Sequence, residues 1–234
     1  MREALITGGA RGIGWGIANA MLEAGYAVTV TGLTPEEVKA VPVREHLKVV
    51  QLDVTSDAQI TALVAGFASL DVVVNCAGII MREAEYEIET FKKVVDVNLT
   101  GTMRMCVAAR PLLAKSGNAA IVNTASMLSF FGGALVPAYA ASKGGIAQLT
   151  KSLAIAWAAE GIRVNAIAPG WISTELTRGL TSDEARSAAI LARTPMKRWG
   201  EPADIGGSIV YLCSDAARFV TGIVLPIDGG YAAM

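Results

Sequence analysis

A tyrosine and a lysine four residues apart are the side chains whose types and spacing best suit proton transfer. They are Tyr139 and Lys143, in the segment Tyr139-Ala-Ala-Ser-Lys143. A phenol is a poor acid–base group at neutral pH, because its pKa is about 10. Residues four apart share one face of a helix, so the lysine charge is expected to lower the pKa of Tyr139. Tyr139 is therefore our candidate general base.

Two more polar residues are candidates for the same reaction. Ser126 ends a predicted strand, where its hydroxyl can stabilise a developing alkoxide or carbonyl oxygen. The alternative for Ser126 is a serine that simply caps the strand end. Asn98 falls inside a predicted helix, where asparagine is mildly unfavourable. That cost suggests a functional role, although a helix break next to Gly101 explains it almost as well.

A glycine-rich turn near the amino terminus is typical of a phosphate-binding loop. The segment Thr7-Gly-Gly-Ala-Arg-Gly-Ile-Gly14 follows a predicted strand and opens a helix. Glycine there permits a tight turn, brings backbone amides close to a pyrophosphate and lets the helix pack near the sheet. The glycines are spaced more loosely than in the usual G-x-G-x-x-G pattern, so the turn alone is a weak signal. The cofactor-binding candidates in it are Gly8, Arg11, Gly12, Ile13 and Gly14.

Other cofactor-binding candidates lie at the ends of predicted strands. Asp53 closes the third strand and can accept a hydrogen bond from an adenine amino group, although a turn-forming aspartate is equally common. Small residues after the fourth strand leave room for a ribose, and a backbone turn with a hydroxyl after the sixth can hold the nicotinamide carboxamide. The candidates of this kind are Gly32, Leu33, Asp53, Val54, Asn75, Ala77, Gly78, Pro169, Gly170, Ile172 and Thr174.

These residues need a framework, and the sequence predicts a parallel sheet. Short runs rich in Val, Ile and Leu alternate with helical patterns, which is typical of βαβ units. Strands are predicted at residues 4–7, 27–31, 48–52, 71–75, 120–124, 163–168 and 223–227. Helices are predicted to begin near Ile13, Pro35, Asp57, Tyr86, Thr100, Ala138, Asp183 and Pro202. We expect an α/β fold, Rossmann-like and doubly wound, with a mostly parallel seven-stranded sheet and helices on both faces.

Length and composition fit this fold and exclude other classes. The 234 residues are expected to form one domain, 1–234, and a hydrophobic share of 53% suits a sheet covered on both faces. The 20 basic and 21 acidic residues balance, without the basic cluster that nucleic acid or an anionic membrane needs. No apolar run approaches a membrane span, so we expect a cytoplasmic protein. The 3 cysteines and the single His46 suggest neither a disulfide framework nor a metal site.

Two segments outside the strands carry local signals. Thr34-Pro-Glu-Glu37 predicts a helix start with a capping box, in which the glutamate bonds back to the N-cap residue. Residues 171–200 are the one irregular region, interpreted as a substrate lid over the carboxyl ends of the strands rather than an ordinary connection. The substrate-pocket candidates are apolar residues that could equally belong to the core: Met127, Leu128, Leu135, Val136 and Trp171.

With these residues in place, the chain resembles the short-chain dehydrogenase/reductase superfamily in its compact single-domain form. The resemblance covers essentially the whole chain, with the glycine turn, Asn75-Cys-Ala-Gly78, Asp96-Val-Asn-Leu99, Ser126, Tyr139-x-x-x-Lys143, Pro169-Gly170 and Asp228-Gly-Gly230 in family order. It implies that Tyr139 is the general acid/base, that Lys143 lowers its pKa and binds the nicotinamide ribose, and that Ser126 orients the substrate oxygen. It also implies that Asn98 holds a proton-relay water near Lys143.

The chain departs from the family pattern where cofactor choice is made. Members that prefer NAD usually carry an aspartate at the end of the second strand, and those that prefer NADP often carry an arginine nearby. Here the strand ends Thr31-Gly32-Leu33, with neither. Arg11 could meet a 2′-phosphate, whereas Glu36 and Glu37 would repel one. We expect NAD(H) or NADP(H) as cofactor and favour NAD.

The resemblance implies an NAD(P)-dependent oxidoreductase that interconverts a secondary alcohol and its ketone. A polyol, sugar or hydroxy acid is the expected small-molecule substrate, and Arg82 could meet a carboxylate, although a solvated arginine is the simpler interpretation. The alternatives are a 3-oxoacyl-thioester reductase of acyl carriers that uses NADPH and a non-catalytic dinucleotide-binding sensor. Family members form dimers and tetramers through the helices near Thr100 and Ala138. Because helix 138–160 is apolar on most faces, we expect a homotetramer or homodimer.

Overall fold

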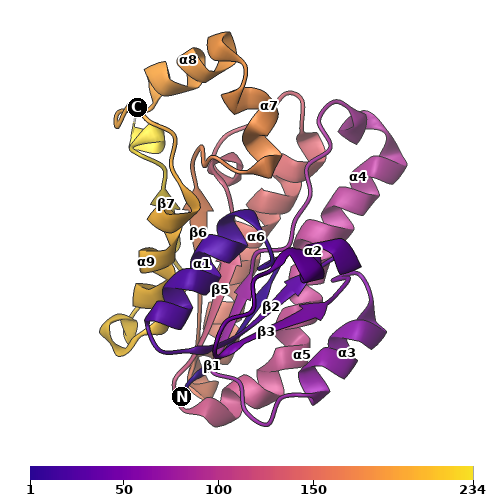
Figure 1. The fold of residues 1–234 in the computed structure, drawn as a ribbon, viewed down its shortest axis with the longest axis vertical. Helices are drawn as coiled ribbons and strands as arrows, with labels where there is room; N and C mark the ends of the chain where they lie inside the picture. Colours follow the sequence, from indigo (N-terminus) through magenta and orange to yellow (C-terminus); the bar gives the residue numbers. More distant parts are fainter. Residues whose placement is uncertain (234) are drawn as a thin grey trace.

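Seven parallel strands form one sheet in the computed structural model, which describes residues 1–233 (Figure 1). The strand order is β3-β2-β1-β4-β5-β6-β7, so successive crossovers run outward in both directions from β1 and β4. This confirms the predicted doubly wound fold, and all six pairings are parallel. Every strand lies within one residue of its predicted bounds: β1 Glu3–Thr7, β2 Ala27–Gly32, β3 Leu47–Gln51, β4 Val72–Asn75, β5 Ala119–Thr124, β6 Ile162–Pro169 and β7 Val224–Ile227.

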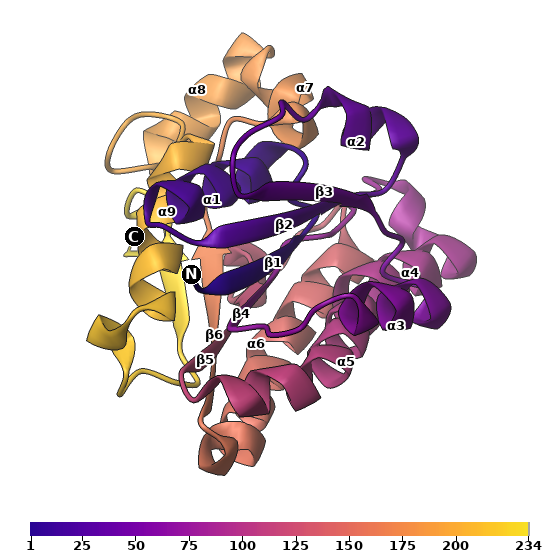
Figure 2. The same ribbon diagram turned by 60° about the horizontal axis from the view of Figure 1, so that its bottom comes forward.

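Helices cover both faces of the sheet (Figure 2). Alternate residues of a strand point to opposite faces, and in β1 Ile6 packs into the core under α1 and α9 while Leu5 packs into the core under α3, α5 and α6. Both cores are built from Val, Ile, Leu, Ala and Met side chains that are almost fully buried. The helices are α1 Gly12–Glu23, α2 Pro35–Ala40, α3 Asp57–Ala65, α4 Ile88–Val95, α5 Gly101–Ser116, α6 Pro137–Trp157, α7 Arg178–Thr181, α8 Glu184–Arg193 and α9 Pro202–Cys213.

Two predicted helix starts were wrong in detail. The helix expected near Tyr86 begins at Ile88, after a short 3-10 turn at Ala84–Tyr86. The helix expected near Thr100 does not start afresh, because α4 continues into α5 through a π-helical turn at Asp96–Thr100. An i→i+5 turn of this kind inserts an extra residue into the helix and often lies at a functional site.

The predicted capping box at α2 forms only in half. The Thr34 hydroxyl accepts a hydrogen bond from the Glu37 amide at 3.3 Å, as expected. The Glu37 carboxylate, however, accepts from the Leu33 amide at 2.7 Å instead of from the N-cap residue. It therefore reaches back to the end of β2, at the carboxyl edge of the sheet.

Residues 171–200 are not irregular, contrary to expectation, because they contain α7 and α8. The base of the segment is closed by a bridge between Ile172 and Gly200. Its two hydrogen bonds run from the Ser173 amide to the Gly200 carbonyl (2.8 Å) and from the Gly200 amide to the Trp171 carbonyl (2.9 Å). Neither helix contains a buried residue. Among the helices of residues 1–233, none has the length and apolar character to cross a membrane.

Candidate active site

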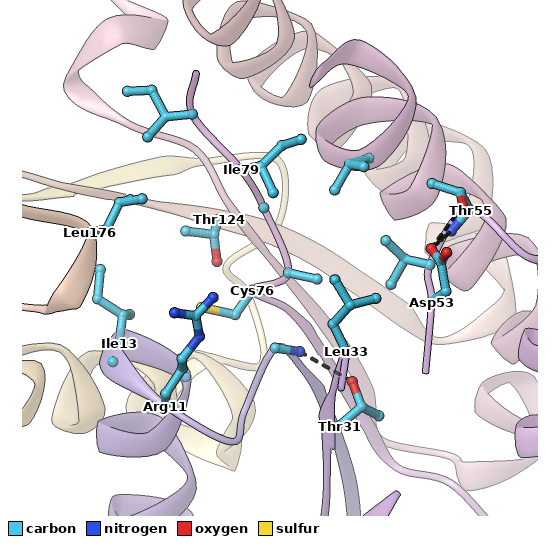
Figure 3. Close-up of a pocket in the computed structure, with 18 of the residues that line it drawn as sticks. Arg11, Ile13, Thr31, Leu33, Asp53, Thr55, Cys76, Ile79, Thr124 and Leu176 are labelled. Atoms are coloured by element: carbon cyan, nitrogen blue, oxygen red, sulfur yellow. Dashed lines mark hydrogen bonds between the residues drawn. The ribbon is translucent and has the colours of Figure 1, made fainter. Parts of the chain in front are cut away.

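A cleft of about 990 Å³ opens at the carboxyl ends of the strands. Figure 3 shows Arg11 and Ile13 of the glycine turn on one side, with Cys76 and Thr124 behind them and Leu33 and Asp53 farther along. Polar and apolar side chains from opposite ends of the sequence meet here, as expected at a topological switch point. The predicted residues that line the cleft are Gly8, Arg11, Gly12, Ile13, Gly14, Leu33, Asp53, Val54, Ala77, Gly78, Tyr139, Lys143 and Thr174.

Other predicted cofactor residues support the cleft from behind. Asn75 is 3% exposed, and its amide nitrogen donates to the Asn123 side-chain oxygen at 2.9 Å. Ile172 packs into the core with α1 and α9. A Cβ added to Gly170 would lie 2.6 Å from the Asp228 Cα, so backbone fills that side. Gly32 and Pro169 are buried strand residues.

The glycine turn has the geometry that a pyrophosphate needs. Gly8 adopts φ +63°, and a Cβ there would lie 2.8 Å from the Ala77 Cα. The turn therefore packs directly against the loop after β4. Helix α1 begins at Gly12 with no side-chain cap, which leaves its first backbone amides available to an anion. These features fit the diphosphate of a dinucleotide.

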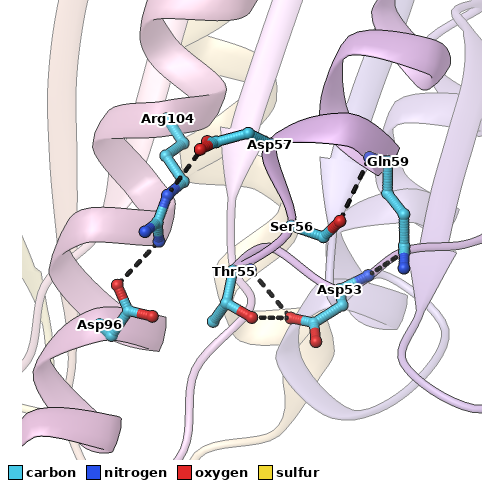
Figure 4. Close-up of polar contacts among 7 residues, drawn as sticks. All are labelled: Asp53, Thr55, Ser56, Asp57, Gln59, Asp96 and Arg104. Carbon is cyan, nitrogen blue, oxygen red and sulfur yellow. Dashed lines mark hydrogen bonds and ion pairs between the residues drawn. The ribbon is translucent and has the colours of Figure 1, made fainter.

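Asp53 forms a local turn and also lines the cleft (Figure 4). One carboxylate oxygen accepts from both the amide and the hydroxyl of Thr55, at 2.8 and 2.7 Å. The Asp53 amide donates to the Gln59 side chain at 2.9 Å. No hydrogen bond in residues 1–233 uses the second carboxylate oxygen, so the turn-forming and adenine-binding interpretations are compatible.

Tyr139 and Lys143 lie one turn apart on α6, with the Lys143 Nζ 5.5 Å from the tyrosine ring centre. The ammonium is 4% exposed and donates to the Thr124 carbonyl at 2.5 Å. Burial lowers the pKa of Lys143 from 10.5 to about 8.

The pKa of the Tyr139 phenol is raised, opposite to the direction that the spacing predicts. Burial is the largest cause, and a hydrogen bond with Ser126 and the charge of Arg82 act against it. A carboxylate at Glu85 and the thiol of Cys76 raise it further. The Lys143 charge does not offset this effect of burial. The four-residue spacing predicts that the two side chains share one face of the helix, but it does not predict how far burial removes the phenol from water.

Asn98 lies in the π-helical turn and holds the loop after β4. Its side-chain oxygen accepts from the Ile79 amide at 2.8 Å, and its nitrogen donates to the Ile79 carbonyl at 2.9 Å. The same nitrogen donates to the Ser142 hydroxyl on α6 at 3.1 Å. Asn98 thus lies where the helix is distorted, and its side-chain amide joins α6 to the loop that carries Gly78.

Glu85, a buried carboxylate in the 3-10 turn before α4, belongs to the site although no sequence pattern predicts it. Glu85 is 1% exposed. Its two oxygens accept from the Met81 amide at 2.9 Å and from the Tyr139 amide at 2.8 Å. No local pattern separates it from Glu83 and Glu87, which are exposed. Glu85 fixes the loop after β4 to the residue that carries the phenol.

The substrate-pocket candidates fall into two groups. Met127 and Val136 are each 6% exposed, and Met127 packs in a core cluster with Ile146. Leu135 is 50% exposed, while Leu128 and Trp171 are half-buried. Trp171 makes edge-on contacts with two aromatic rings that the sequence analysis did not select, Trp199 and Tyr231.

Comparison with known proteins agrees with this geometry. A family model described as enoyl-(acyl carrier protein) reductase matches residues 8–232. The 2-dehydro-3-deoxy-D-gluconate 5-dehydrogenases of Pseudoalteromonas atlantica and Bacillus subtilis are 42% and 41% identical, over 98% of this chain and 95% and 94% of theirs. This chain is a short-chain dehydrogenase/reductase. The crystal structure of a gluconate 5-dehydrogenase from Burkholderia cenocepacia in complex with NADP and tartrate superposes with a TM-score of 0.94, at 34% identity, covering 100% of this chain and 96% of that one.

As a short-chain dehydrogenase/reductase, the protein is an NAD(P)-dependent oxidoreductase that acts on CH–OH groups. The alternative of a non-catalytic sensor is thereby set aside. The residues present fit a nicotinamide dinucleotide, because the glycine turn, Lys143 and Tyr139 line one cleft and the first amides of α1 have no side-chain cap. Among residues 1–233, no three His, Cys, Asp or Glu side chains gather as a metal ion would require.

Proposed function

We propose that this short-chain dehydrogenase/reductase interconverts a secondary hydroxyl group and a ketone on a sugar acid, with Arg82 binding the substrate carboxylate. Arg82 carries the proposal, because it follows Met81 of the cleft wall in the chain and its charge lowers the pKa of the Tyr139 phenol. The guanidinium is exposed, and no carboxylate within residues 1–233 forms an ion pair with it. An arginine fork binds a carboxylate through two parallel hydrogen bonds.

The comparisons support an acidic substrate. The two sequence relatives are named for a sugar acid, 2-dehydro-3-deoxy-D-gluconate. The Burkholderia structure holds tartrate, which is also a hydroxy acid. The alternative substrate class, a 3-oxoacyl thioester, is the one named for a relative that is 36% identical over 98% of this chain, the 3-oxoacyl-[acyl-carrier-protein] reductase of Staphylococcus aureus. The description of the family model names an enoyl substrate instead. The tyrosine–lysine spacing of four is not the one that the family's enoyl reductases use, which disfavours enoyl reduction.

The proposed roles follow from where each side chain lies. The bound dinucleotide supplies the hydride acceptor in oxidation and the donor in reduction. Tyr139, as phenolate, takes the proton of the substrate hydroxyl, and Ser126 holds the same oxygen through its hydroxyl. Lys143 binds ribose hydroxyls and keeps a positive charge beside the phenol. Asn98 fixes the loop after β4 and the helix that carries both residues.

Three further properties belong to this proposal. Residues 171–200 act as a lid, since the bridge between Ile172 and Gly200 holds the two ends of the segment together and the segment presents two exposed helices. The chain assembles as a homodimer or homotetramer through α5 and α6, where Val107 and Ile155 are 51% and 83% exposed. It acts in the cytoplasm, where its 3 free thiols stay reduced.

The test is a comparison of charged and neutral substrates. We expect kcat/KM for gluconate and 2-dehydro-3-deoxygluconate to exceed that for D-glucitol by about 100-fold, since two charge-assisted hydrogen bonds to the substrate carboxylate contribute a few kcal/mol. Arg82→Gln should remove that difference mainly through KM, whereas Arg218→Gln, an exposed arginine elsewhere, should not. Equal kcat/KM for acid and polyol in the unmodified protein would contradict the proposal. Faster turnover of acetoacetyl thioester would favour the acyl-carrier alternative.

A further inference from the structure

Gly32 ends β2 without a side chain, and the side chain of another residue fills the space beside it. A Cβ added to Gly32 would lie 3.0 Å from the Glu37 Cβ and 3.4 Å from the Glu37 Oε2. Glu37 comes from α2, in the next element along the chain. Its carboxylate thus lies at the end of β2, on the wall of the cleft that also includes Leu33 and Asp53.

Both oxygens of the Glu37 carboxylate are held in place. Oε2 accepts from the Leu33 amide at 2.7 Å, and Oε1 lies 3.0 Å from the Arg11 Nε. Glu37 is also the third residue of α2, where the Thr34 hydroxyl caps its amide and Pro35 fixes the first turn. Each oxygen keeps a further lone pair that can accept a hydroxyl proton.

The two partners of this ion pair differ in freedom. The Glu37 side chain is 23% exposed, whereas the Arg11 side chain is 64% exposed. The carboxylate is therefore the fixed member of the pair, and the guanidinium is the member that can move. An exposed ion pair is weak by itself, but the bond from the Leu33 amide holds the carboxylate independently of Arg11.

We infer that Glu37 selects NAD over NADP. Its carboxylate, which fills the space that the Gly32 position leaves open, accepts hydrogen bonds from the adenosine ribose hydroxyls and repels a 2′-phosphate. The same carboxylate neutralises Arg11, the cation of the glycine turn that would otherwise attract that phosphate. The inference rests on the proposed function only in that the cleft holds a nicotinamide dinucleotide, and it does not depend on the substrate.

The ion pair between Glu37 and Arg11 allows a specific prediction, because one substitution at Glu37 changes the charge of both partners' surroundings. Glu37→Gln keeps an oxygen that can accept from the Leu33 amide but removes the charge. It abolishes the repulsion and releases Arg11 at the same time, so NADPH affinity should rise while NADH affinity falls modestly. Arg11→Ala in the Glu37→Gln background should then remove the gain in NADPH affinity.

The experiment is a fluorescence titration of the purified protein with NADH and with NADPH, which needs no substrate or turnover. We expect NADH to bind at least about 30-fold more tightly than NADPH, and Glu37→Gln to reduce that ratio at least about 10-fold, as expected when a like charge a few ångströms away is removed from a half-exposed site. Glu36→Gln is the matched control, since Glu36 is the preceding residue, carries the same charge and is exposed. Its ratio should stay within about twofold of the unmodified protein.

The outcomes separate this inference from the proposed function. Tighter binding of NADPH by the unmodified protein, or an unchanged ratio in Glu37→Gln, would overturn it. An equal change in Glu36→Gln would also overturn it, because the effect would then come from net charge alone. Thermal unfolding of each variant checks that α2 remains folded. If the NADH preference holds but no sugar acid is turned over, the proposed substrate fails and this inference stands.

Discussion

The cleft has two walls that are built in different ways. On one side, Lys143 on α6, Glu85 in the loop after β4 and Asn98 in the π-helical turn that holds this loop are each at most 4% exposed. Every one of them bonds to backbone from another element. On the other side, residues 171–200 contain two helices without a buried residue. Several of their polar contacts are local, such as those between Arg186 and Asp183.

The difference indicates that one wall holds the catalytic groups in a fixed geometry and the other admits and covers the substrate. Groups that must hold a geometry within a fraction of an ångström are packed into the sheet, where their rotamers cannot change. A segment that must admit a substrate and then cover it cannot be buried in this way, because opening would cost the whole of that burial. Substitutions on the buried wall should therefore change the chemical step, and substitutions in residues 171–200 should change substrate binding.

The largest effect is expected at Tyr139. Tyr139→Phe removes the only proposed proton acceptor and keeps the ring, so kcat should fall by about 1000-fold. Binding of NADH should change by no more than about threefold, since the phenol oxygen contributes little to cofactor affinity. Stopped-flow absorbance and NADH fluorescence titration measure the two quantities. Tyr211→Phe on α9 is the control, and a Tyr139→Phe variant with normal turnover would disprove the assignment.

Substitution of Lys143 should change activity and stability in opposite directions. Its pKa is about 8 in the folded protein and 10.5 in an ordinary environment, so between these pH values the unfolded chain binds more protons. The free energy of unfolding should therefore rise with pH across that window. Lys143→Met should lower kcat by about 100-fold or more, yet raise stability at pH 7, because the cost of burying the ammonium disappears. Loss of the hydrogen bond to the Thr124 carbonyl offsets part of that gain and leaves on the order of 1–2 kcal/mol.

Urea unfolding at pH 7 and at pH 10 tests this prediction. The stability gain of Lys143→Met should shrink at the higher pH, because the unmodified protein no longer keeps a buried charge there. The same gain at both pH values would show that the buried ammonium is not the cause.

A smaller effect is expected from Glu85, which positions Tyr139 without touching the substrate. A glutamine cannot accept from both the Met81 and Tyr139 amides, so Glu85→Gln should lower kcat by about 10-fold. The Glu85 carboxylate raises the pKa of the Tyr139 phenol. Because Glu85→Gln removes that charge, the midpoint of the acid limb in the pH profile of the oxidation rate should also move to lower pH. A purely structural role would leave that midpoint unchanged. Glu87→Gln, an exposed neighbour, is the control.

The contrast between the two walls also explains what the sequence can predict. Strands of buried Val, Ile and Leu can be read from local pattern, because a parallel sheet demands continuous apolar runs, and the seven strands lie where expected. Motif residues such as Gly8 and Tyr139 come together because the fold requires it. The role of Glu85, the direction of the phenol pKa and the reach of Glu37 depend on contacts between distant elements. No local spacing encodes these contacts.

The smallest effect should come from the base of residues 171–200. A Cβ at Gly200 would lie 2.5 Å from the Ile172 Cδ1, so Gly200→Ala must move the Ile172 side chain at the bridge that joins the two ends of the segment. If the segment is a lid, KM for the substrate should rise about 3- to 10-fold while NADH affinity and the pH profile stay unchanged. Gly179→Ala, in α7 of the same segment, is the matched control because nothing lies within 4 Å of its Cβ. A fall in kcat with no change in KM would show instead that this segment acts on the chemical step, and the contrast between the two walls would not hold.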